Sequence, residues 1–279
     1  KPIDQWDNDS LITAMVGRSL DNQFPKEFGE KSKEPMLEVD NVVEAGVLND
    51  VSFKAYGGQI LGFAGPVGAG RTEIMRAVFG ADPIDSGKIK IKGKEVHIKS
   101  PRQAIKHGIA FLTEDRKGQG LVLAQTIRTN LILANMKGFS SGLFLNEKKI
   151  LETGEQNIAS LRIKTPSIDE IVGQLSGGNQ QKVVIGKWVN TDADIFIFDE
   201  PTRGIDVGAK VEVYNVMNSL VKQGKCVIMV SSEMPEILGM SDRVIVMRGG
   251  EVMAEVDRDS EHFNQEDLMK AAWGGKLDD

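Results

Sequence analysis

The stretch that decides the fold spans residues 65–72 and reads Gly65-Pro66-Val67-Gly68-Ala69-Gly70-Arg71-Thr72. Its spacing is that of a phosphate-binding loop, Gly-x-x-x-x-Gly-Lys-Ser/Thr, except that Arg71 takes the lysine position. Glycines let the backbone wrap around phosphate groups, and the N–H groups at the start of the following helix favour an anion. We therefore expect residues 65–73, which end with Glu73, to bind a nucleoside triphosphate, with the Thr72 hydroxyl on Mg²⁺.

The residues on either side of this loop fit that interpretation. Residues 59–64 form a short apolar run typical of a strand, and residues 73–79 place Ile74 and Val78 on one side of a predicted helix. A strand, a loop and a helix in this order are the context that a phosphate-binding loop requires. A structural turn without a ligand remains the alternative for a glycine-rich loop taken alone.

Composition sets limits on the function. The chain has 279 residues, of which 41% are hydrophobic and 27% charged, and its formal net charge is −6. This is ordinary for a globular protein, and it offers no basic field for broad nucleic-acid binding. The only cysteine, Cys226, lies in an apolar run and is expected to be a buried thiol in a reducing compartment. The chain starts at Lys1 without Met, and we expect it to be a fragment of a longer protein.

Patterns along the chain predict an α/β fold. Residues 1–33 are polar, with a helical stretch at 10–17 and a linker at about 22–31. Alternating segments at 36–40, 51–53 and 88–92 predict a small antiparallel sheet, and Gly93 marks a turn. Residues 128–189 are helical in pattern, clearest at 129–136 and 147–152. Apolar strands at 195–198, 226–230 and 243–247 then alternate with helices, which predicts a mostly parallel sheet covered on both faces.

The strand at 195–198 ends in two carboxylates, Asp199 and Glu200. We expect Asp199 to hold Mg²⁺ and Glu200 to polarise the water that attacks the γ-phosphate. A strand followed by a solvated acidic turn is the alternative for these residues alone.

A second glycine-rich stretch runs from 175 to 182 and reads Leu175-Ser176-Gly177-Gly178-Asn179-Gln180-Gln181-Lys182. It opens a predicted helix from about Asn179 to Trp188, so Ser176, Gly177 and Gly178 form a second anion-binding nest. One small phosphate group hardly needs two nests. We infer that the second nest closes on a nucleotide held by another copy of the fold, with a purely structural cap as the alternative.

Together these motifs resemble the ATP-binding-cassette (ABC) ATPases over about residues 34–257. Residues 65–72 resemble the Walker A loop, 195–200 the Walker B strand, 175–182 the signature motif and 203–206 the D-loop with Asp206. The resemblance implies residues 1–33 as a connector, 34–257 as the ATP-binding domain with a helical subdomain at about 115–190, and 258–279 as a tail. It also implies that Gln180 and Asp206 contact nucleotide. Two further segments look more narrowly like the second cassette of tandem ATPases that drive ribose, galactose or xylose importers. They are Thr113-Glu114-Asp115-Arg116-Lys117 and Ser231-Ser232-Glu233-Met234-Pro235-Glu236.

Four positions depart from the pattern of an active ABC site. Arg71 replaces the loop lysine, Glu114 stands at the Q-loop glutamine, and Ser232 stands at the switch histidine. No aromatic residue occupies 40–49, where the family stacks adenine. A bulky guanidinium does not mimic a compact ammonium, and loss of one transition-state donor costs about 10²–10³ in rate. We expect ATP and Mg²⁺ to bind, with Thr72, Asp199 and Glu114 as metal residues and Glu200, Ser232 and Glu114 as catalytic residues, but hydrolysis to be slow.

The resemblance implies a division of labour between two cassettes. The signature of this chain would complete the pocket of a first cassette, while permease subunits dock near 114–136 and a separate solute-binding protein selects the sugar. No nucleic acid is expected as a partner, and the implied location is the cytoplasmic face of a bacterial inner membrane. A nucleotide-gated regulatory half with negligible hydrolysis, nucleoside instead of sugar import, and a non-transport ABC protein are the alternatives.

Overall fold

The structure is a computed structural model that describes residues 23–142 and 144–277. Its centre is a six-stranded sheet in the order β12-β11-β3-β10-β9-β6, in which only β12 runs antiparallel to its neighbour. The strands are β3 Ile60–Ala64, β6 Ile109–Leu112, β9 Ile195–Asp199, β10 Cys226–Val230, β11 Arg243–Arg248 and β12 Glu251–Asp257. Strands β3, β6, β9 and β10 are buried along their whole length, which explains their unbroken apolar sequences. The predicted parallel sheet is confirmed.

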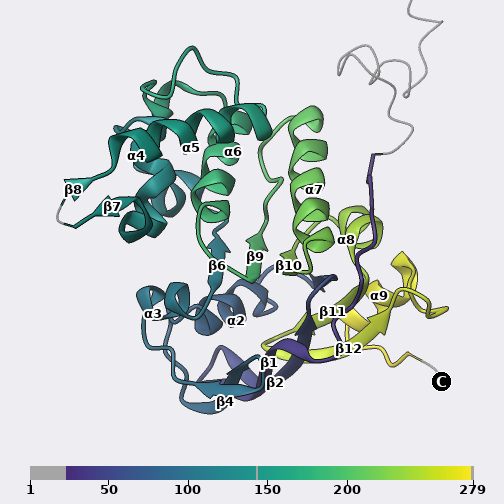
Figure 1. Ribbon diagram of the computed structural model, residues 1–279. Coiled ribbons are helices and arrows are strands. Elements are labelled where there is room, and N and C mark those ends of the chain that lie inside the picture. The colour runs from purple at the N-terminus through teal and green to yellow at the C-terminus, as the bar shows by residue number, and fades with distance from the viewer. Residues whose placement is uncertain (1–22, 143, 278–279) are drawn as a thin grey trace, which may run out of the picture.

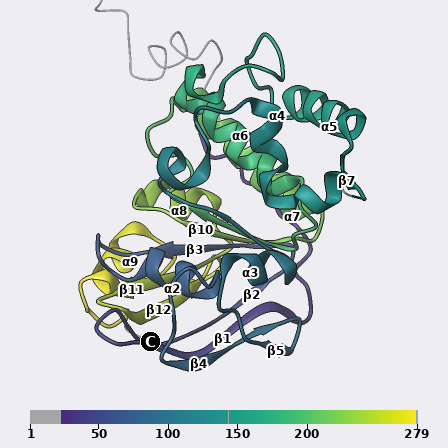
Figure 2. The same ribbon diagram turned by 90° about the vertical axis from the view of Figure 1, so that its left-hand side faces the viewer.

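A second sheet, ordered β2-β1-β4-β5, is antiparallel throughout and confirms the predicted β subdomain. Its strands are β1 Pro35–Glu44, β2 Leu48–Tyr56, β4 Ser86–Ile91 and β5 Lys94–Val96. The chain reverses between β4 and β5 at Gly93, whose φ of 74° suits glycine. Figure 2 shows helix α2 (Arg71–Val78) between the two sheets, and α2 contacts β2.

Helices cover both faces of the six-stranded sheet, as the sequence predicts. On the face away from α2, α7 (Val207–Lys222) contacts β10 and α8 (Met234–Met240) contacts β3 (Figure 2). At one edge of the sheet α3 (Pro101–Lys106) contacts β6, and at the other end α9 (Gln265–Ala272) contacts β11 and the edge strand β12. The thiol of Cys226 is fully buried in β10, as expected.

A helical subdomain lies beyond the β6 side of the sheet (Figure 1). It contains η2 Arg116–Gly120, α4 Ile127–Ile132, η3 Leu133–Phe139, α5 Glu147–Ser160, η4 Val172–Gln174 and α6 Gly177–Val189. The helix expected at 129–136 is shorter, because α4 ends at Ile132 and Asn135 has a non-helical backbone. The Asn135 side chain instead bonds the backbone of Asn190 and Gly138, which favours a turn over a continued helix.

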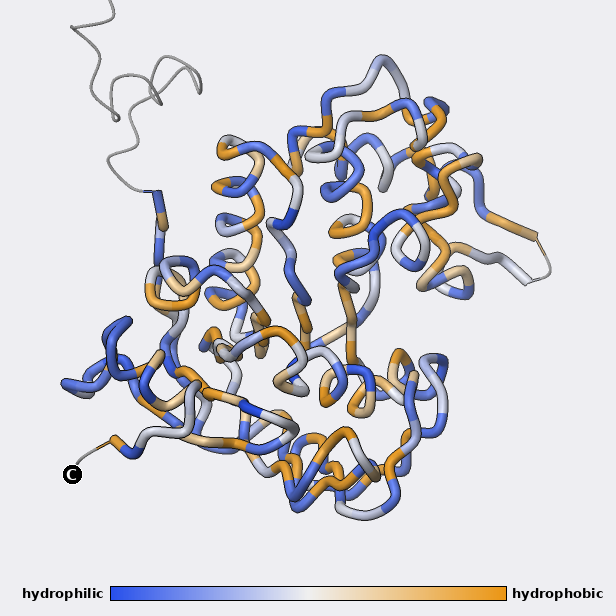
Figure 3. Tube along the Cα trace, turned by 180° about the vertical axis from the view of Figure 1, so that it is seen from behind, coloured by the Kyte–Doolittle hydropathy of each residue, from blue (hydrophilic) through white to orange (hydrophobic). Residues whose placement is uncertain are grey.

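A short hairpin projects from this subdomain and was not predicted. It pairs β7 (Ser140–Ser141) with β8 (Phe144–Leu145). Figure 3 shows β8 as a hydrophobic segment at the edge of the molecule, and the Phe144 side chain is 79% exposed.

The segment before β1 is fastened to the domain although it forms no regular element from residue 23 to 34. Phe24 packs against the Tyr214 ring at a centroid distance of 5.8 Å. The buried Lys26 ammonium lies 2.7 Å from a carboxylate oxygen of Asp242. The part of the predicted linker that is described here is therefore a strap held by α7 and the turn before β11, and the helix predicted at 10–17 lies outside the described residues.

The predicted tail also packs on the domain. Leu268, Ala271 and Ala272 of α9 are buried in the common hydrophobic core, while Trp273 is 68% exposed. Within the part of the chain that the structure describes, no helix has both the length and the apolar character needed to cross a bilayer.

Candidate functional site

The phosphate-binding loop connects the end of β3 at Ala64 to the start of α2 at Arg71. A Cβ at Gly65 would lie 2.2 Å from the carbonyl oxygen of Met247, so only glycine fits there. Gly70 has a φ of 96° at the N-cap of α2. The loop is held from behind, because the Gly250 N–H donates to the Ala69 carbonyl over 3.0 Å. The sheet and the β11–β12 turn thus shape the loop before any ligand binds.

The Arg71 side chain reaches the residues that directly follow β10 and β9. Its Nη1 donates to the backbone carbonyl of Ser231 over 2.6 Å, and its Nη2 lies 3.9 Å from Oε1 of Glu200. The side chain is only 9% exposed. Burial lowers the pKa of Arg71, against the opposing effect of Glu200 and Asp199. At the position where the family pattern has a lysine, this chain therefore has an arginine whose guanidinium already binds Ser231 and Glu200.

Thr72 and Asp199 form the part of the site suited to a divalent cation. The Thr72 hydroxyl donates to Asp199 Oδ1 over 3.1 Å, whereas the other carboxylate oxygen of Asp199 is buried without a hydrogen-bond partner. Burial raises the pKa of Asp199 to about 6. Both residues line a cavity of about 260 Å³ together with Glu114. An unpaired buried carboxylate oxygen beside a hydroxyl fits Mg²⁺, which binds few protein oxygens and takes further ligands from water and phosphate.

Glu200 lies directly after β9 in an uncommon backbone conformation, with a φ of 48°. Its Oε2 accepts a hydrogen bond of 3.1 Å from the Ser232 hydroxyl. Burial raises the pKa of Glu200, while nearby Arg71 and Ser232 lower it. Strained residues of this kind cluster at functional sites. The structure brings together Arg71, Glu200 and Ser232, as the motif assignment requires.

Glu114 pairs with Arg203, which lies in the turn after Glu200. Arg116 donates to the backbone carbonyls of Arg203 and Gly204 over 3.1 and 3.3 Å. Glu114 thus lines the Thr72–Asp199 cavity while it is paired with the guanidinium of Arg203. Sequence reasoning named Glu114 but missed the roles of Arg203 and Arg116, because the pairing of residues 89 positions apart leaves no local signal.

The signature stretch lies at the start of α6 and packs on the D-loop. A Cβ at Gly177 would lie 2.8 Å from Nη2 of Arg116, and one at Gly178 would lie 2.9 Å from Cβ of Ala209. Asp206 caps α7 by accepting the Ala209 N–H over 2.9 Å. Close packing against Ala209 therefore favours glycine at 178, whereas a side chain at 177 would displace only the mobile end of Arg116.

Two predicted nucleotide contacts of this region have other partners in the structure. The hydroxyl of Ser176 accepts from the Asn179 side chain over 3.0 Å and makes no capping bond. Gln180 is buried, and its amide donates to the Val172 carbonyl over 3.3 Å. The Gln180 side chain therefore lies inside the domain.

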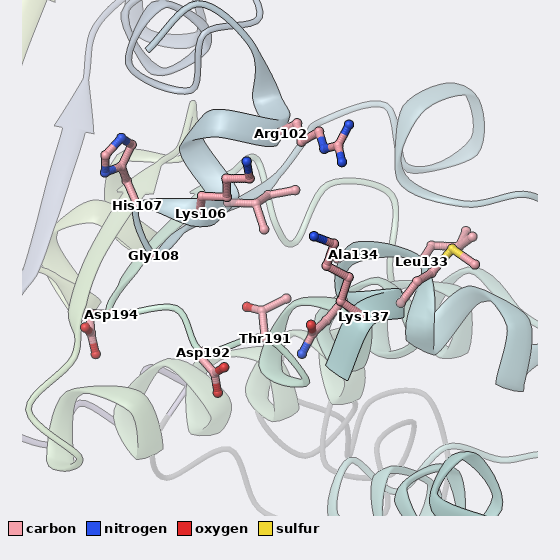
Figure 4. Close-up of a pocket in the computed structure, with 13 residues that line it drawn as sticks. Arg102, Lys106, His107, Gly108, Leu133, Ala134, Lys137, Thr191, Asp192 and Asp194 are labelled. Carbon is pink, nitrogen blue, oxygen red and sulfur yellow. The ribbon is translucent and has the colours of Figure 1, made fainter. Parts of the chain in front are cut away.

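A larger groove lies apart from these residues, between α3, η3 and residues 191–194. Its volume is about 850 Å³. Figure 4 shows Arg102, Lys106 and Lys137 around one part of it and Asp192 and Asp194 around another. Its apolar surface includes Leu133 and Met136, which are 38% and 48% exposed.

Comparison with known proteins decides the family. The model of the ABC transporter family matches residues 48–203, which contain the phosphate-binding loop, the signature and the Asp199–Glu200 pair. The chain belongs to the ABC transporter family. The chain is therefore an ABC ATP-binding domain, an ATPase, and Thr72, Asp199 and Glu200 lie within or beside its phosphate-binding region.

Among curated relatives, the ABC chain is 49% identical to the ribose import ATP-binding protein of Oceanobacillus iheyensis, over 95% of this chain and 53% of the relative. It is 47% identical to a ribose import ATP-binding protein of Rubrobacter xylanophilus, over 96% of this chain and 53% of that protein. The chain therefore spans about half the length of the curated relatives it matches.

Solved structures show the same fold. An ATP-binding cassette of an ABC transporter in its ADP conformation superposes with a TM-score of 0.70 at 22% identity, over 85% of this chain and 94% of that one. The dimeric structure of a bacterial ABC transporter cassette superposes with a TM-score of 0.69 at 19% identity, over 81% of this chain and 100% of that one. The predicted cassette fold is confirmed.

Proposed function

We propose that the chain is the second ATP-binding cassette of a tandem ATPase that drives import of a monosaccharide. The observation that carries the proposal is the Thr72–Asp199 pair, whose unpartnered Asp199 oxygen lies buried beside the phosphate-binding loop. Identity of 47–49% to ribose import ATP-binding proteins supports the sugar class. Nucleoside import is the alternative substrate class, and transport assays with both solutes separate the two.

Each residue of the site has a defined task in this proposal. The N–H groups of the loop and of the first turn of α2 bind the phosphates. Thr72 and Asp199 hold Mg²⁺, and Glu114 approaches it from the facing loop. Glu200 accepts a proton from the attacking water, and the Ser232 hydroxyl orients its carboxylate. Magnesium, when bound, offsets the charge of the transferred phosphoryl group.

The division of labour follows from Arg71. Its guanidinium is bound to the Ser231 carbonyl, so we infer that the pocket of this chain mainly binds ATP and turns it over slowly. The open N-terminus of α6 then completes the pocket of a first cassette, where most hydrolysis takes place. In the extreme case this chain is a regulatory half that hydrolyses almost no ATP. The rate of single-turnover ATP hydrolysis by this chain tests that case.

Two substitutions in the complete two-cassette protein test this asymmetry. Ser176→Arg is expected to remove most ATPase activity, because a long cation blocks the nest that faces the other pocket. Glu200→Gln is expected to cost less than about twofold, since its pocket contributes little turnover. Ser141→Arg makes the same change at an exposed serine of the helical subdomain and is the matched control. Comparable losses from Ser176→Arg and Glu200→Gln would contradict the proposal.

We further propose that the 850 Å³ groove receives a permease subunit, which would hold the protein at the cytoplasmic face of a bacterial inner membrane. Exposed Leu133 and Met136 offer apolar contacts, and Lys106, Lys137 and Asp192 around them offer charges for ion pairs. Met136→Asp should abolish permease-dependent stimulation of ATPase activity and sugar uptake. Met253→Asp, at a 38% exposed methionine of β12, is the control. Stimulation that survives Met136→Asp would place the permease elsewhere.

A further inference from the structure

One buried carboxylate behind the site has no part in the proposal above. Glu236, in helix α8, is 0% exposed. It accepts hydrogen bonds from the hydroxyls of Thr202 over 2.6 Å and Tyr214 over 2.7 Å, and from the hydroxyl of Ser231. Among residues 23–142 and 144–277, no ion pair includes Glu236. A buried carboxylate without a cation depends on such donors, because burial of a charge is otherwise costly.

The three donors come from three separate elements at the carboxyl edge of the sheet. Thr202 lies in the turn after β9, Ser231 directly follows β10, and Tyr214 belongs to α7. The Ser231 hydroxyl is fixed on both sides, since it also accepts the N–H of Glu233 over 3.0 Å. Glu236 therefore helps the sheet to hold the peptide of Ser231, and with it the backbone carbonyl that Arg71 binds.

We propose that Glu236 is a positioning residue that holds Arg71 on the Ser231 carbonyl, so that its guanidinium is not free to bind a triphosphate. The path has two hydrogen bonds. The Ser231 hydroxyl donates to Glu236, and the Ser231 carbonyl accepts from Nη1 of Arg71. In this state the guanidinium lies beside Glu200. A bound triphosphate can pair with the Arg71 guanidinium only after Arg71 has left the Ser231 carbonyl. Because a firmly held Ser231 makes this step more costly, it weakens nucleotide binding.

This inference rests on the proposed binding of nucleotide in the Arg71 pocket. Its test is Mg·ATP calorimetry on the 279-residue chain, whose described residues share one main hydrophobic core. Glu236→Gln keeps the shape but removes the charge that receives the Ser231 hydroxyl. We expect Mg·ATP to bind about three- to tenfold more tightly to Glu236→Gln than to the wild type.

A double-mutant cycle with Arg71→Lys separates positioning from a general structural effect. Lysine is shorter and lacks the planar fork, so it cannot bind the Ser231 carbonyl and Glu200 in the same way. In the Arg71→Lys background, Glu236→Gln should change the affinity by less than about twofold. Glu233→Gln makes the same substitution on the exposed carboxylate before α8, which pairs with Lys210, and is the matched control.

A second variant keeps the test decisive if Glu236→Gln does not fold. Ser231→Ala removes the hydroxyl that joins Ser231 to Glu236 and leaves the two other donors in place, so it should tighten Mg·ATP binding in the same direction. Unchanged or weaker binding in folded variants, or an equal change with Arg71 and with Lys at position 71, overturns the role of Glu236. Wild-type protein that fails to bind Mg·ATP refutes the proposed function itself, which is a separate result.

Discussion

The N-termini of α2 and α6 use the same backbone device in different surroundings. Helix α2 begins after a glycine-rich loop and α6 begins with two glycines, and a helix N-terminus of this kind suits phosphate. At α2 the first turn carries Arg71 and Glu73, and the arginine is bound by the protein itself. At α6 the first turn has no acidic residue, and its glycines pack against Arg116 and Ala209. The comparison teaches that the nest beside Glu200 is restrained through a side chain, Arg71, whereas the nest at α6 is restrained by the packing of its glycines.

The sharpest way to break this comparison is to remove the Thr72 hydroxyl at the α2 end, which we propose binds Mg²⁺. Thr72→Val keeps the side-chain shape but removes the donor to Asp199. We expect the Mg²⁺-dependent gain in ATP affinity to fall about 10–100-fold, the range seen when groups that support metal ligands are lost. Titrations with and without EDTA measure it. Without Mg²⁺ the variant should match the wild type, and an equal loss under both conditions would refute a metal role for Thr72.

A pH experiment tests the contact between α6 and η2, the segment that follows Glu114. Lys187 of α6 is buried and donates to the Gly120 carbonyl over 2.6 Å, in the turn after Glu114. Burial lowers the pKa of Lys187 from 10.5 to about 8. Between these values the folded chain binds fewer protons than the unfolded chain, so stability contributed by this group rises with pH.

The matching variant is Lys187→Met. The unfolding free energy of the wild type should rise by about 2 kcal/mol relative to Lys187→Met as the pH increases from about 8 to 10.5. Urea unfolding at a series of pH values gives this difference. Lys149→Met, at an exposed lysine of α5, should show a flat difference over the same range. If the difference in unfolding free energy between the wild type and Lys187→Met does not change with pH, the pKa of Lys187 is not lowered in the folded protein.

The restraint on Arg71 can be removed directly. Arg71→Lys should raise single-turnover ATP hydrolysis in the pocket of this chain by about tenfold, because a free ammonium can reach the phosphates and a well-placed donor is worth about 10²–10³ in rate. Arg76→Lys, in the same helix but paired with Asp82, is the control and should leave turnover unchanged. Equal turnover for Arg71→Lys and the wild type would show that the altered cation is not what limits hydrolysis.

Sequence patterns predicted those parts of the molecule that depend on local spacing. The loop at 65–72, the buried strands around Asp199 and Cys226, and the antiparallel segments near Gly93 all follow from residue type and period, and they were found where expected. The position of Arg71 was not predictable, because its partner Ser231 is 160 residues away. The same holds for Glu236, which looks like an ordinary helical surface residue until its three hydroxyl donors are seen.

Packing also changed the meaning of residues that the pattern did identify. Gln180 belongs to the signature stretch, yet its side chain is buried against Val172. The polar composition of residues 22–31 indicated a linker, although two side chains there dock in the domain. A polar composition does not tell a free linker from a docked one, because one aromatic contact and one buried ion pair are enough to hold an extended segment.

The smallest expected effect concerns this N-terminal strap, which contacts α7 and the turn before β11. Phe24 packs on Tyr214, which donates to Glu236 behind Arg71. Phe24→Ala should lower the unfolding free energy by about 1 kcal/mol, less than for a fully buried ring because Phe24 is half-buried. Phe28→Ala, at a 63% exposed ring in the same strap, should cost under about 0.5 kcal/mol. Equal losses in denaturant titrations would mean that the strap does not dock through Phe24, and its link to the Arg71 side of the site would have to be abandoned.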